Sequence, residues 1–211
     1  LYLKATCLML EGNAAEAIPI FRQAIAIQPS VEAYVNLAAV HQELLELEEW
    51  IACLKKVIEL DGETGNLGEL AKSRVEDFAA SVRKSDGLAL DQYFENGRRF
   101  KRAFEHLTSG RFADAVRGFS EVLKISPRHV QSYGNLGLAY AGLGDRGRSL
   151  ECLEKAIALD PGYEPAIDNR RILLDQPLDQ PLLASSVRQI DFYGDREREC
   201  SGQRRPYSSL T

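Results

Sequence analysis

The stretch that decides the fold runs from Tyr133 to Pro161 and reads YGNLGLAYAGLGDRGRSLECLEKAIALDP. Its first half has apolar or small residues at positions i, i+3, i+4 and i+7, which share one face of a helix: Tyr133, Leu136, Gly137 and Tyr140. Gly144 then ends this helix, because glycine adopts the left-handed conformation that is common after a helix C-terminus. A second apolar stripe follows, and Pro161 stops it by removing a backbone donor. The stretch therefore predicts two antiparallel helices joined by a tight turn.

The same pattern recurs along the chain at a fixed spacing. When residues 96–127 are aligned with residues 130–161, Gly110 pairs with Gly144 and Pro127 pairs with Pro161, in each case 34 residues apart. The N-terminal part fits the same template, and four copies result, at about 1–29, 31–62, 96–127 and 130–161. A period of this length is typical of a solenoid built from stacked repeats.

In the best copy, the motif Tyr133-x₂-Leu136-Gly137-x₂-Tyr140, followed by Ser149-x₃-Leu153 and Pro161, resembles the tetratricopeptide repeat. That family's pattern is Trp-x₂-Leu-Gly-x₂-Tyr, then Ala-x₃-Phe and Pro, over about 34 residues. The resemblance implies an all-α fold, an α-solenoid of antiparallel helix pairs that stack into a superhelix. The second copy departs from the pattern at three positions, where Leu45 replaces the turn glycine, Trp50 the small alanine and Gly62 the proline.

We divide the chain into four parts on this basis. Residues 1–62 are an N-terminal module of two repeats, and 63–95 an irregular helical connector. Residues 96–175 are a C-terminal module of two repeats and a capping helix over 164–175. Residues 176–211 are a mostly disordered tail with a short docked segment at 182–192, because this part lacks a sustained hydrophobic period.

Two arrangements of the connector stay open. Residues 66–83 are expected to form one helix, followed by a turn at 85–87. If residues 88–107 form one long helix, the alternation of antiparallel pairs is broken and the superhelix splits into two modules. If Asn96-Gly97 breaks that helix instead, 88–95 becomes a short helix and the superhelix is continuous. We favour the split.

Composition excludes several classes of protein. The 211 residues carry 26 basic and 31 acidic side chains, and this mildly acidic balance argues against a nucleic-acid partner. No run of 18 apolar residues predicts a membrane span. The four cysteines are far apart, which argues against a zinc site or a disulfide framework and favours a reducing, cytoplasmic compartment.

The motifs that could carry chemistry have simpler explanations. Residues 142–147 match GxGxxG, but a dinucleotide fingerprint needs a preceding strand, and here a helix precedes it. His41 and His106 occupy the position of Tyr140, where a flat ring packs between helices, and His129 lies in a turn between repeats. We therefore expect no catalytic residue, metal or cofactor, and predict that the protein is not an enzyme.

The resemblance also implies a site, since the first helices of tetratricopeptide pairs line a concave surface that holds an extended peptide or a helix of a partner protein. The candidate peptide-binding residues at the matching positions are Phe100, Lys101, Phe104, Gln131, Gly134, Asn135, Leu138, Asp168, Asn169 and Ile172. Gly134 is expected to leave a hollow that admits a side chain. Asn36, Asn135 and Asn169 occupy the position where family members place an asparagine that bonds a peptide.

Some family members bind a C-terminal carboxylate with two asparagines and three basic residues. Lys101 matches one basic position, but Gly97 and Gln131 stand where lysine is expected. The incomplete set argues against a receptor for chaperone tails.

Two other interpretations stay open beside a protein-binding scaffold. The chain starts with Leu1 rather than methionine, which suggests a regulatory arm of a larger enzyme or of a secretion or assembly component. Self-association is a further alternative, through an apolar patch on the first repeat formed by Leu1, Leu3, Leu8 and Leu10. Two charge clusters, an acidic one at 43–49 and a basic one at 98–102, are most simply solvated faces, or else polar partner surfaces.

Overall fold

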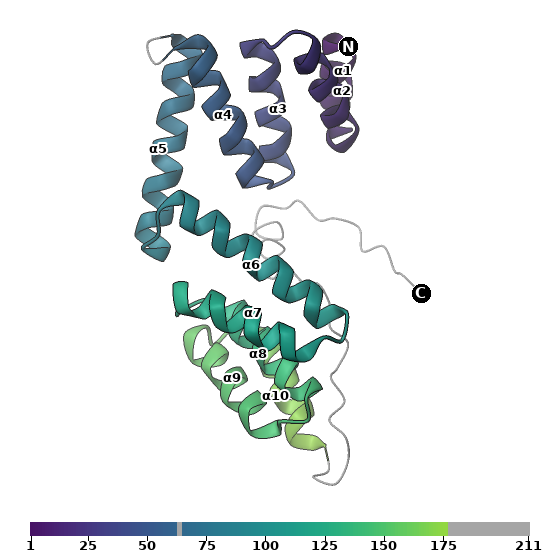
Figure 1. Ribbon diagram of the computed structural model, residues 1–211, viewed down its shortest axis with the longest axis vertical. Coiled ribbons are helices and arrows are strands. Elements are labelled where there is room, and N and C mark those ends of the chain that lie inside the picture. Colours follow the sequence, from purple (N-terminus) through teal and green to yellow (C-terminus); the bar gives the residue numbers. More distant parts are fainter. Residues whose placement is uncertain (63–64, 177–211) are drawn as a thin grey trace. The chain divides into compact units, whose positions relative to one another are not determined.

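The computed structural model describes residues 1–62 and 65–176. Ten α-helices follow one another in these ranges, and no strand occurs among them (Figure 1). The helices are α1 Tyr2–Leu10, α2 Ala14–Ile27, α3 Val31–Glu43, α4 Leu47–Asp61, α5 Asn66–Asp86, α6 Leu90–Thr108, α7 Phe112–Ile125, α8 Val130–Gly142, α9 Arg146–Leu159 and α10 Glu164–Asp175. The predicted all-α helical repeat fold is confirmed. Apart from Gln176, the predicted tail and its docked segment lie outside the described residues.

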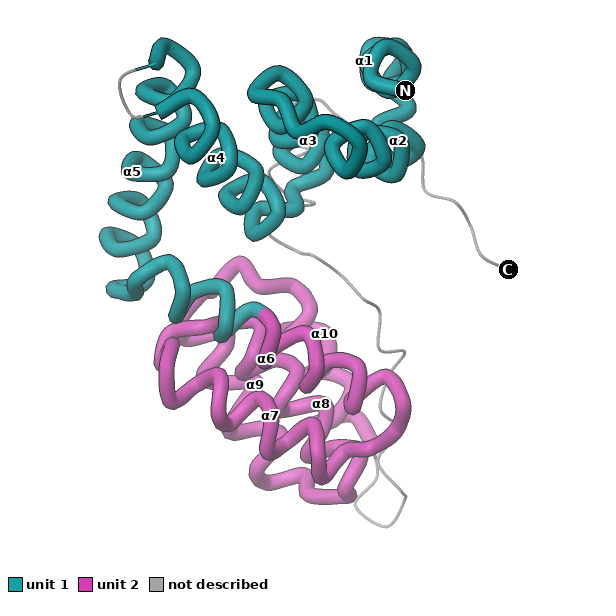
Figure 2. The backbone as a smooth tube through the Cα atoms, turned by 45° about the horizontal axis from the view of Figure 1, so that its top comes forward, with its two compact units in different colours: residues 1–97 teal, residues 98–211 magenta. Residues whose placement is uncertain are grey.

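The helices divide into two compact units, Leu1–Gly97 and the chain from Arg98 onward (Figure 2). Within unit 1, each helix from α1 to α5 packs on the next one in the chain. Within unit 2, the same order holds from α7 to α10. Neighbour-on-neighbour packing of this kind is what a solenoid requires. The boundaries predicted at residues 62, 95 and 175 stay predictions.

Four helix pairs close through the same turn. In the clearest case, the Gly144 amide donates to the carbonyl of Ala141 and the Asp145 amide donates to the carbonyl of Tyr140, both at 2.9 Å. This pair of bonds is the Schellman motif, which satisfies the last carbonyls of the first helix. The residue that turns the chain has a positive φ in all four pairs: Gly12 at 80°, Leu45 at 59°, Gly110 at 71° and Gly144 at 78°.

Leu45 is the only non-glycine residue with a positive φ in the described chain. Its turn keeps both hydrogen bonds, because Leu45 donates to Gln42 and Glu46 donates to His41. A residue with a Cβ adopts this conformation at a cost of roughly 1–2 kcal/mol. The second repeat thus departs from the family pattern in sequence but keeps the geometry of its turn.

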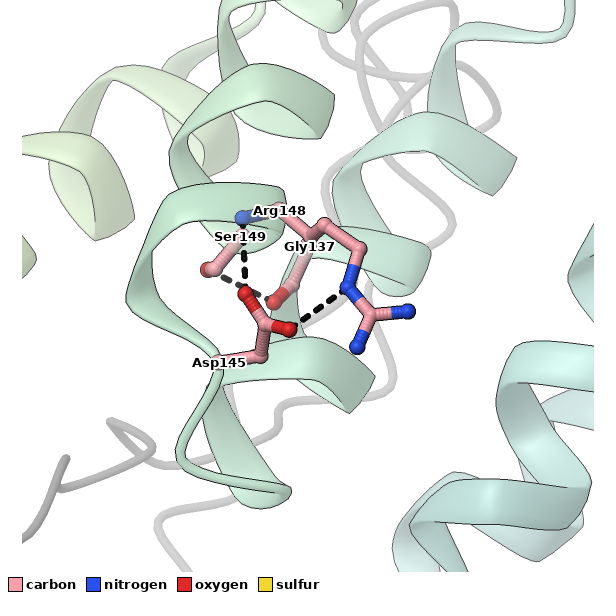
Figure 3. A network of polar contacts seen from close by, with 4 residues as sticks. All are labelled: Gly137, Asp145, Arg148 and Ser149. Carbon is pink, nitrogen blue, oxygen red and sulfur yellow. Dashed lines mark hydrogen bonds and ion pairs between the residues drawn. The ribbon is translucent and has the colours of Figure 1, made fainter.

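The second helix of the best pair begins with a polar network, shown in Figure 3. Asp145 caps α9, since its Oδ1 accepts the amide of Arg148 at 2.9 Å and its Oδ2 accepts from the Arg148 side chain. These bonds, the backbone one foremost, hold the pKa of Asp145 below its usual value. Ser149 is buried and donates to the carbonyl of Gly137 at 2.7 Å, which ties α9 to α8. A Cβ on Gly137 would lie 2.9 Å from Cγ of Leu153, so small residues at these two positions allow the helices to meet.

The connector differs from one of the two predicted arrangements. α5 covers the helix predicted at 66–83, and α6 then runs without a break through Asn96-Gly97. The alternative in which these two residues end a short helix at 88–95 is therefore wrong. Asn96 is buried, and Phe94 before it and Phe100 after it pack into hydrophobic cores, so packing on either side holds the helix through a residue of low helix propensity.

Two histidines have the structural roles that the sequence predicts. His41 is 1% exposed between helices, and its Nδ1 lies 2.6 Å from Oε2 of Glu46. His129 caps α8 through a bond from the Ser132 amide to its Nδ1 at 3.2 Å. Residues 142–147 form the end of α8, its Schellman turn and the start of α9, and no strand precedes them in the described chain.

Candidate peptide-binding face

The ten candidate residues all lie in unit 2, on the first helices of its pairs, α6 and α8, and on α10. The ten residues differ in their exposure to solvent. Gly134 and Leu138 are buried; Phe100, Phe104, Gln131, Asn135, Asn169 and Ile172 are half-buried; Lys101 and Asp168 are exposed. We call the half-buried and exposed members on α6 and α8 the α6–α8 face: Phe100, Lys101, Phe104, Gln131 and Asn135.

Two phenylalanines form the apolar part of this face. The rings of Phe100 and Phe104 stack with centroids 6.4 Å apart and planes 20° from parallel. The ring of Phe100 also packs in edge-to-face geometry against the rings of Phe119 and His129, with centroids 5.6 Å and 5.2 Å away, and Phe119 is fully buried. These contacts fix the position of the Phe100 ring. The stack is thus a fixed platform with part of its surface open to solvent.

Sequence reasoning missed the part that His129 plays in this platform. His129 lies one residue before α8, and Tyr163 lies 34 residues later, one residue before α10. Both are aromatic N-cap residues that pack on the preceding first helix, so the repeat spacing was the signal that could have revealed them.

The hollow predicted beside Gly134 is filled. A Cβ on Gly134 would lie 2.9 Å from Cε1 and 3.4 Å from Oη of Tyr163, whose side chain is buried. Burial, with a smaller contribution from the charge of Asp160, raises the pKa of Tyr163 to about 12. The expectation that Gly134 admits a partner's side chain is therefore wrong, because the chain's own aromatic ring occupies the space.

The three asparagines at the family's peptide-binding position have different surroundings. Asn36 donates to the hydroxyl of Tyr2 at 2.9 Å and to Thr6 at 3.5 Å, which ties α3 to α1 in unit 1. Asn169 donates to the carbonyl of Pro165 at 2.7 Å within α10. Asn135 makes no side-chain hydrogen bond within the described part of the chain.

The repeat explains why Asn135 differs from Asn36. The residues of α6 that correspond to Tyr2 and Thr6 are Phe100 and Phe104, which offer no hydrogen-bonding atom. The amide of Asn135 is therefore left half-buried, with two donors and one acceptor unused within the described chain.

The charged candidates divide in the same way. Lys101 is exposed and forms no ion pair with any described residue. Asp168 on α10 is engaged with Arg171, whose Nη2 lies 2.8 Å from its Oδ1 on the exposed surface. Gln131 and Lys101 are thus, with Asn135, the polar side chains of the α6–α8 face that are available to a ligand in the described chain.

Two kinds of site are absent from the described ranges. No group of histidine, cysteine and carboxylate side chains there could hold a metal ion. Among the described helices, none is both long and apolar enough to cross a membrane.

A family model for the tetratricopeptide repeat matches residues 1–30, 31–64 and 130–163. This chain therefore contains three tetratricopeptide repeats, over those residues. The model does not match residues 96–127, where α6 and α7 nevertheless close through the same Schellman turn at Gly110.

Several known proteins are similar to this chain. The mitochondrial import receptor subunit TOM70 of Rattus norvegicus is 26% identical over 224 residues, which cover 96% of this chain and 36% of the relative. The Hsp70-Hsp90 organizing protein of Triticum aestivum is 35% identical over 54 residues, 26% of this chain and 9% of the relative. Among solved structures, YrrB, described as a TPR protein with an unusual peptide-binding site, has 19% identity and a TM-score of 0.43, and the match covers 81% of this chain and 90% of that chain. The chain thus spans about a third of the length of the TOM70 relative.

Proposed function

We propose that this chain is a non-catalytic scaffold and that its α6–α8 face binds an extended segment of a partner protein. Tetratricopeptide repeat proteins mediate protein–protein interaction, and their members are generally interaction scaffolds rather than enzymes. The observation that carries the proposal is that α8 presents the unpaired, half-buried amide of Asn135 and α6 presents the half-buried Phe100–Phe104 stack.

The amide of Asn135 suits a peptide backbone. Its NH₂ group donates to a carbonyl while its oxygen accepts from an N–H, so one side chain can bond both groups of an extended residue. Each such bond contributes about 1 kcal/mol net, and water is partly excluded at a half-buried position, which strengthens the bond.

The aromatic stack suits an apolar side chain of the partner. Phe100 is already immobilised by Phe119 and His129, so a ligand that packs on Phe104 orders little of the protein. Lys101 lies on the same face and favours an acidic residue in the partner, with a modest effect on affinity and a larger one on the association rate.

The test begins with affinity capture of partners by the full chain and by its Asn135→Ala variant, with mass spectrometry of the bound proteins. Peptides that tile a partner lost from the variant are then titrated by calorimetry. Phe104→Ala is expected to weaken binding by at least about 2 kcal/mol, as at an aromatic hot spot, and Asn135→Ala by about 1–2 kcal/mol.

Asn169→Ala is the matched control, because the amide of Asn169 is already satisfied within α10. It should leave affinity within about twofold of the unchanged chain. Equal affinity for the unchanged chain and for both Phe104→Ala and Asn135→Ala, with helicity retained, would place the binding surface elsewhere.

We also propose that the protein works in the cytoplasm. The support is the spacing of its four cysteines, which suits free thiols in a reducing compartment. Imaging of the tagged chain in its source cells tests this, and a signal confined to an oxidising compartment would contradict it.

A further inference from the structure

The α6–α8 face combines its aromatic stack with positive charge. Lys101 on α6 is exposed, and Arg128 is exposed one residue before His129, whose ring packs on that of Phe100. Neither cation forms an ion pair with a described residue. Glu105, one turn after Lys101 on α6, is exposed and acidic, so these three side chains leave a net positive charge. A segment that complements this face therefore has aromatic residues between acidic ones.

The sequence after α10 contains a segment of this composition, QIDFYGD at residues 189–195. Its aromatic residues, Phe192 and Tyr193, stand between two aspartates, and it contains no basic residue. Tyr207, the other aromatic residue after α10, follows two arginines instead. The segment lies outside the described residues and extends the docked segment predicted at 182–192. Aromatic and acidic character together therefore select 189–195 from this part of the chain.

The connection from α10 to the face is long enough for this segment to reach it. α10 ends at Asp175 and packs on α8, and residues of α8 and α6 lie in one hydrophobic core. Packed helices lie about 8–10 Å apart, which places α6 about 20 Å from α10. The twelve residues 177–188 span up to about 40 Å when extended, or about twice that distance.

We propose that residues 189–195 of this chain bind its own α6–α8 face and compete there with the partner segment. Phe192 packs on the Phe100–Phe104 stack, and Lys101 attracts the aspartates. The inference rests on the proposed function, because it names what occupies the same face when no partner is bound. A short linker gives an effective concentration of about 1 mM. With a Kd of about 0.1 mM for the separate segment, about nine in ten faces are occupied and partner binding is weakened about tenfold.

Heteronuclear NMR of the full chain tests the occupancy, since the side-chain amide of Asn135 reports on the face. Phe192→Ser should shift the Asn135 signal and leave that of Asn169, which is bonded within α10. Tyr207→Ser removes an aromatic ring from the same part of the chain and is the matched control that should shift neither signal. A synthetic peptide of residues 186–198, added to the Phe192→Ser chain, should restore the original Asn135 signal with a Kd of about 0.1 mM.

Charge reversal tests the role of Lys101. Lys101→Glu should weaken binding of the synthetic peptide about twofold to fivefold, as for an exposed ion pair. A peptide with Asp191→Lys and Asp195→Lys should bind the unchanged chain more weakly than the natural peptide does. It should bind the Lys101→Glu chain more tightly than the natural peptide does. Equal affinities of both peptides for both chains would refute the charge complementarity.

Three NMR results would overturn the proposal. These are an Asn135 signal that Phe192→Ser leaves in place, equal shifts in Tyr207→Ser, and shifts that depend on protein concentration, which would assign the segment to a second copy. Failure of the proposed function is read separately, in calorimetry of the tiled partner peptides with Phe104→Ala and Asn135→Ala. If both inferences hold, the Phe192→Ser chain binds the partner peptide about tenfold more tightly than the unchanged chain.

Discussion

Asn36→Ala and Asn135→Ala change the same repeat position in the two units and are expected to have opposite consequences. Asn36 donates to the hydroxyl of Tyr2 at 2.9 Å, whereas Asn135 has no hydrogen-bond partner in the described chain. Asn36→Ala should therefore destabilise unit 1 without touching the α6–α8 face. Asn135→Ala should leave the free energy of unfolding almost unchanged and should weaken binding of the partner segment.

The magnitude follows from the contacts of Asn36. The bond to Thr6 is 3.5 Å long and contributes little, so one good hydrogen bond is lost and the free energy of unfolding falls by about 1 kcal/mol. Asn135→Ala should stay within about 0.5 kcal/mol of the unchanged chain. Tyr2→Phe should cost as much as Asn36→Ala, and the double variant no more than either, which is a coupling energy of about 1 kcal/mol.

The converse change builds the missing partner. Phe100→Tyr places a hydroxyl at the position that Tyr2 has in unit 1, where the amide of Asn135 can bond it. This variant should gain about 1 kcal/mol of stability and lose about fivefold in affinity for the partner segment, because the amide is then occupied.

Urea unfolding followed by circular dichroism gives the free energies, and amide hydrogen exchange shows which unit each variant affects. Calorimetry with the partner peptide gives the affinities. The reasoning is refuted if Asn135→Ala lowers the free energy of unfolding as much as Asn36→Ala does, since its amide would then be bonded within the protein.

Three further predictions concern the packing of unit 2. Gly134→Ala should lower the free energy of unfolding by roughly 1–3 kcal/mol, because the added methyl lies 2.9 Å from the ring of Tyr163; a urea midpoint equal to that of the unchanged chain would contradict the filled site. Ser149→Ala removes the buried hydrogen bond from the Ser149 hydroxyl to the Gly137 carbonyl, which keeps its bond within α8, and should cost about 0.5–1.5 kcal/mol by urea unfolding; no change in the midpoint would contradict a stabilising bond here. The pKa of Tyr163 is about 12 in the folded chain and 10.0 outside the protein, so the neutral side chain stabilises the fold below pH 10 and roughly 2–3 kcal/mol of this stability is lost as pH rises through 12. In Tyr163→Phe the free energy of unfolding should therefore fall less steeply between pH 10 and 12. Equal slopes for the two proteins would exclude Tyr163 as the cause of the loss.

The helix pairs were predictable because their signals are local. The Schellman turn at Gly144 needs only a residue that tolerates a positive φ and two amides within five residues, and the 34-residue spacing repeats that demand. Even Leu45 could be placed in such a turn, because it aligns with the turn glycines of the other repeats. The strain of its positive φ, by contrast, is seen only in the folded backbone.

The continuous α6 was beyond local rules. An Asn-Gly pair is a common helix breaker, yet α6 passes through Asn96-Gly97 because its residues pack on either side of that pair. Propensity amounts to about 1 kcal/mol here, and burial of the flanking aromatic side chains outweighs it.

By itself the sequence determined the all-α repeat fold, the four turns and the repeat positions that are candidates for a ligand, since each depends on spacing along one chain. Only the tertiary structure decided which of those positions is free. Tyr163 fills the space at Gly134, Tyr2 satisfies Asn36, and two phenylalanines leave Asn135 unpaired. The physical reason is that hydrogen bonding and close packing depend on which side chain arrives from the neighbouring helix, and the repeat pattern specifies the position of that side chain but not its chemistry.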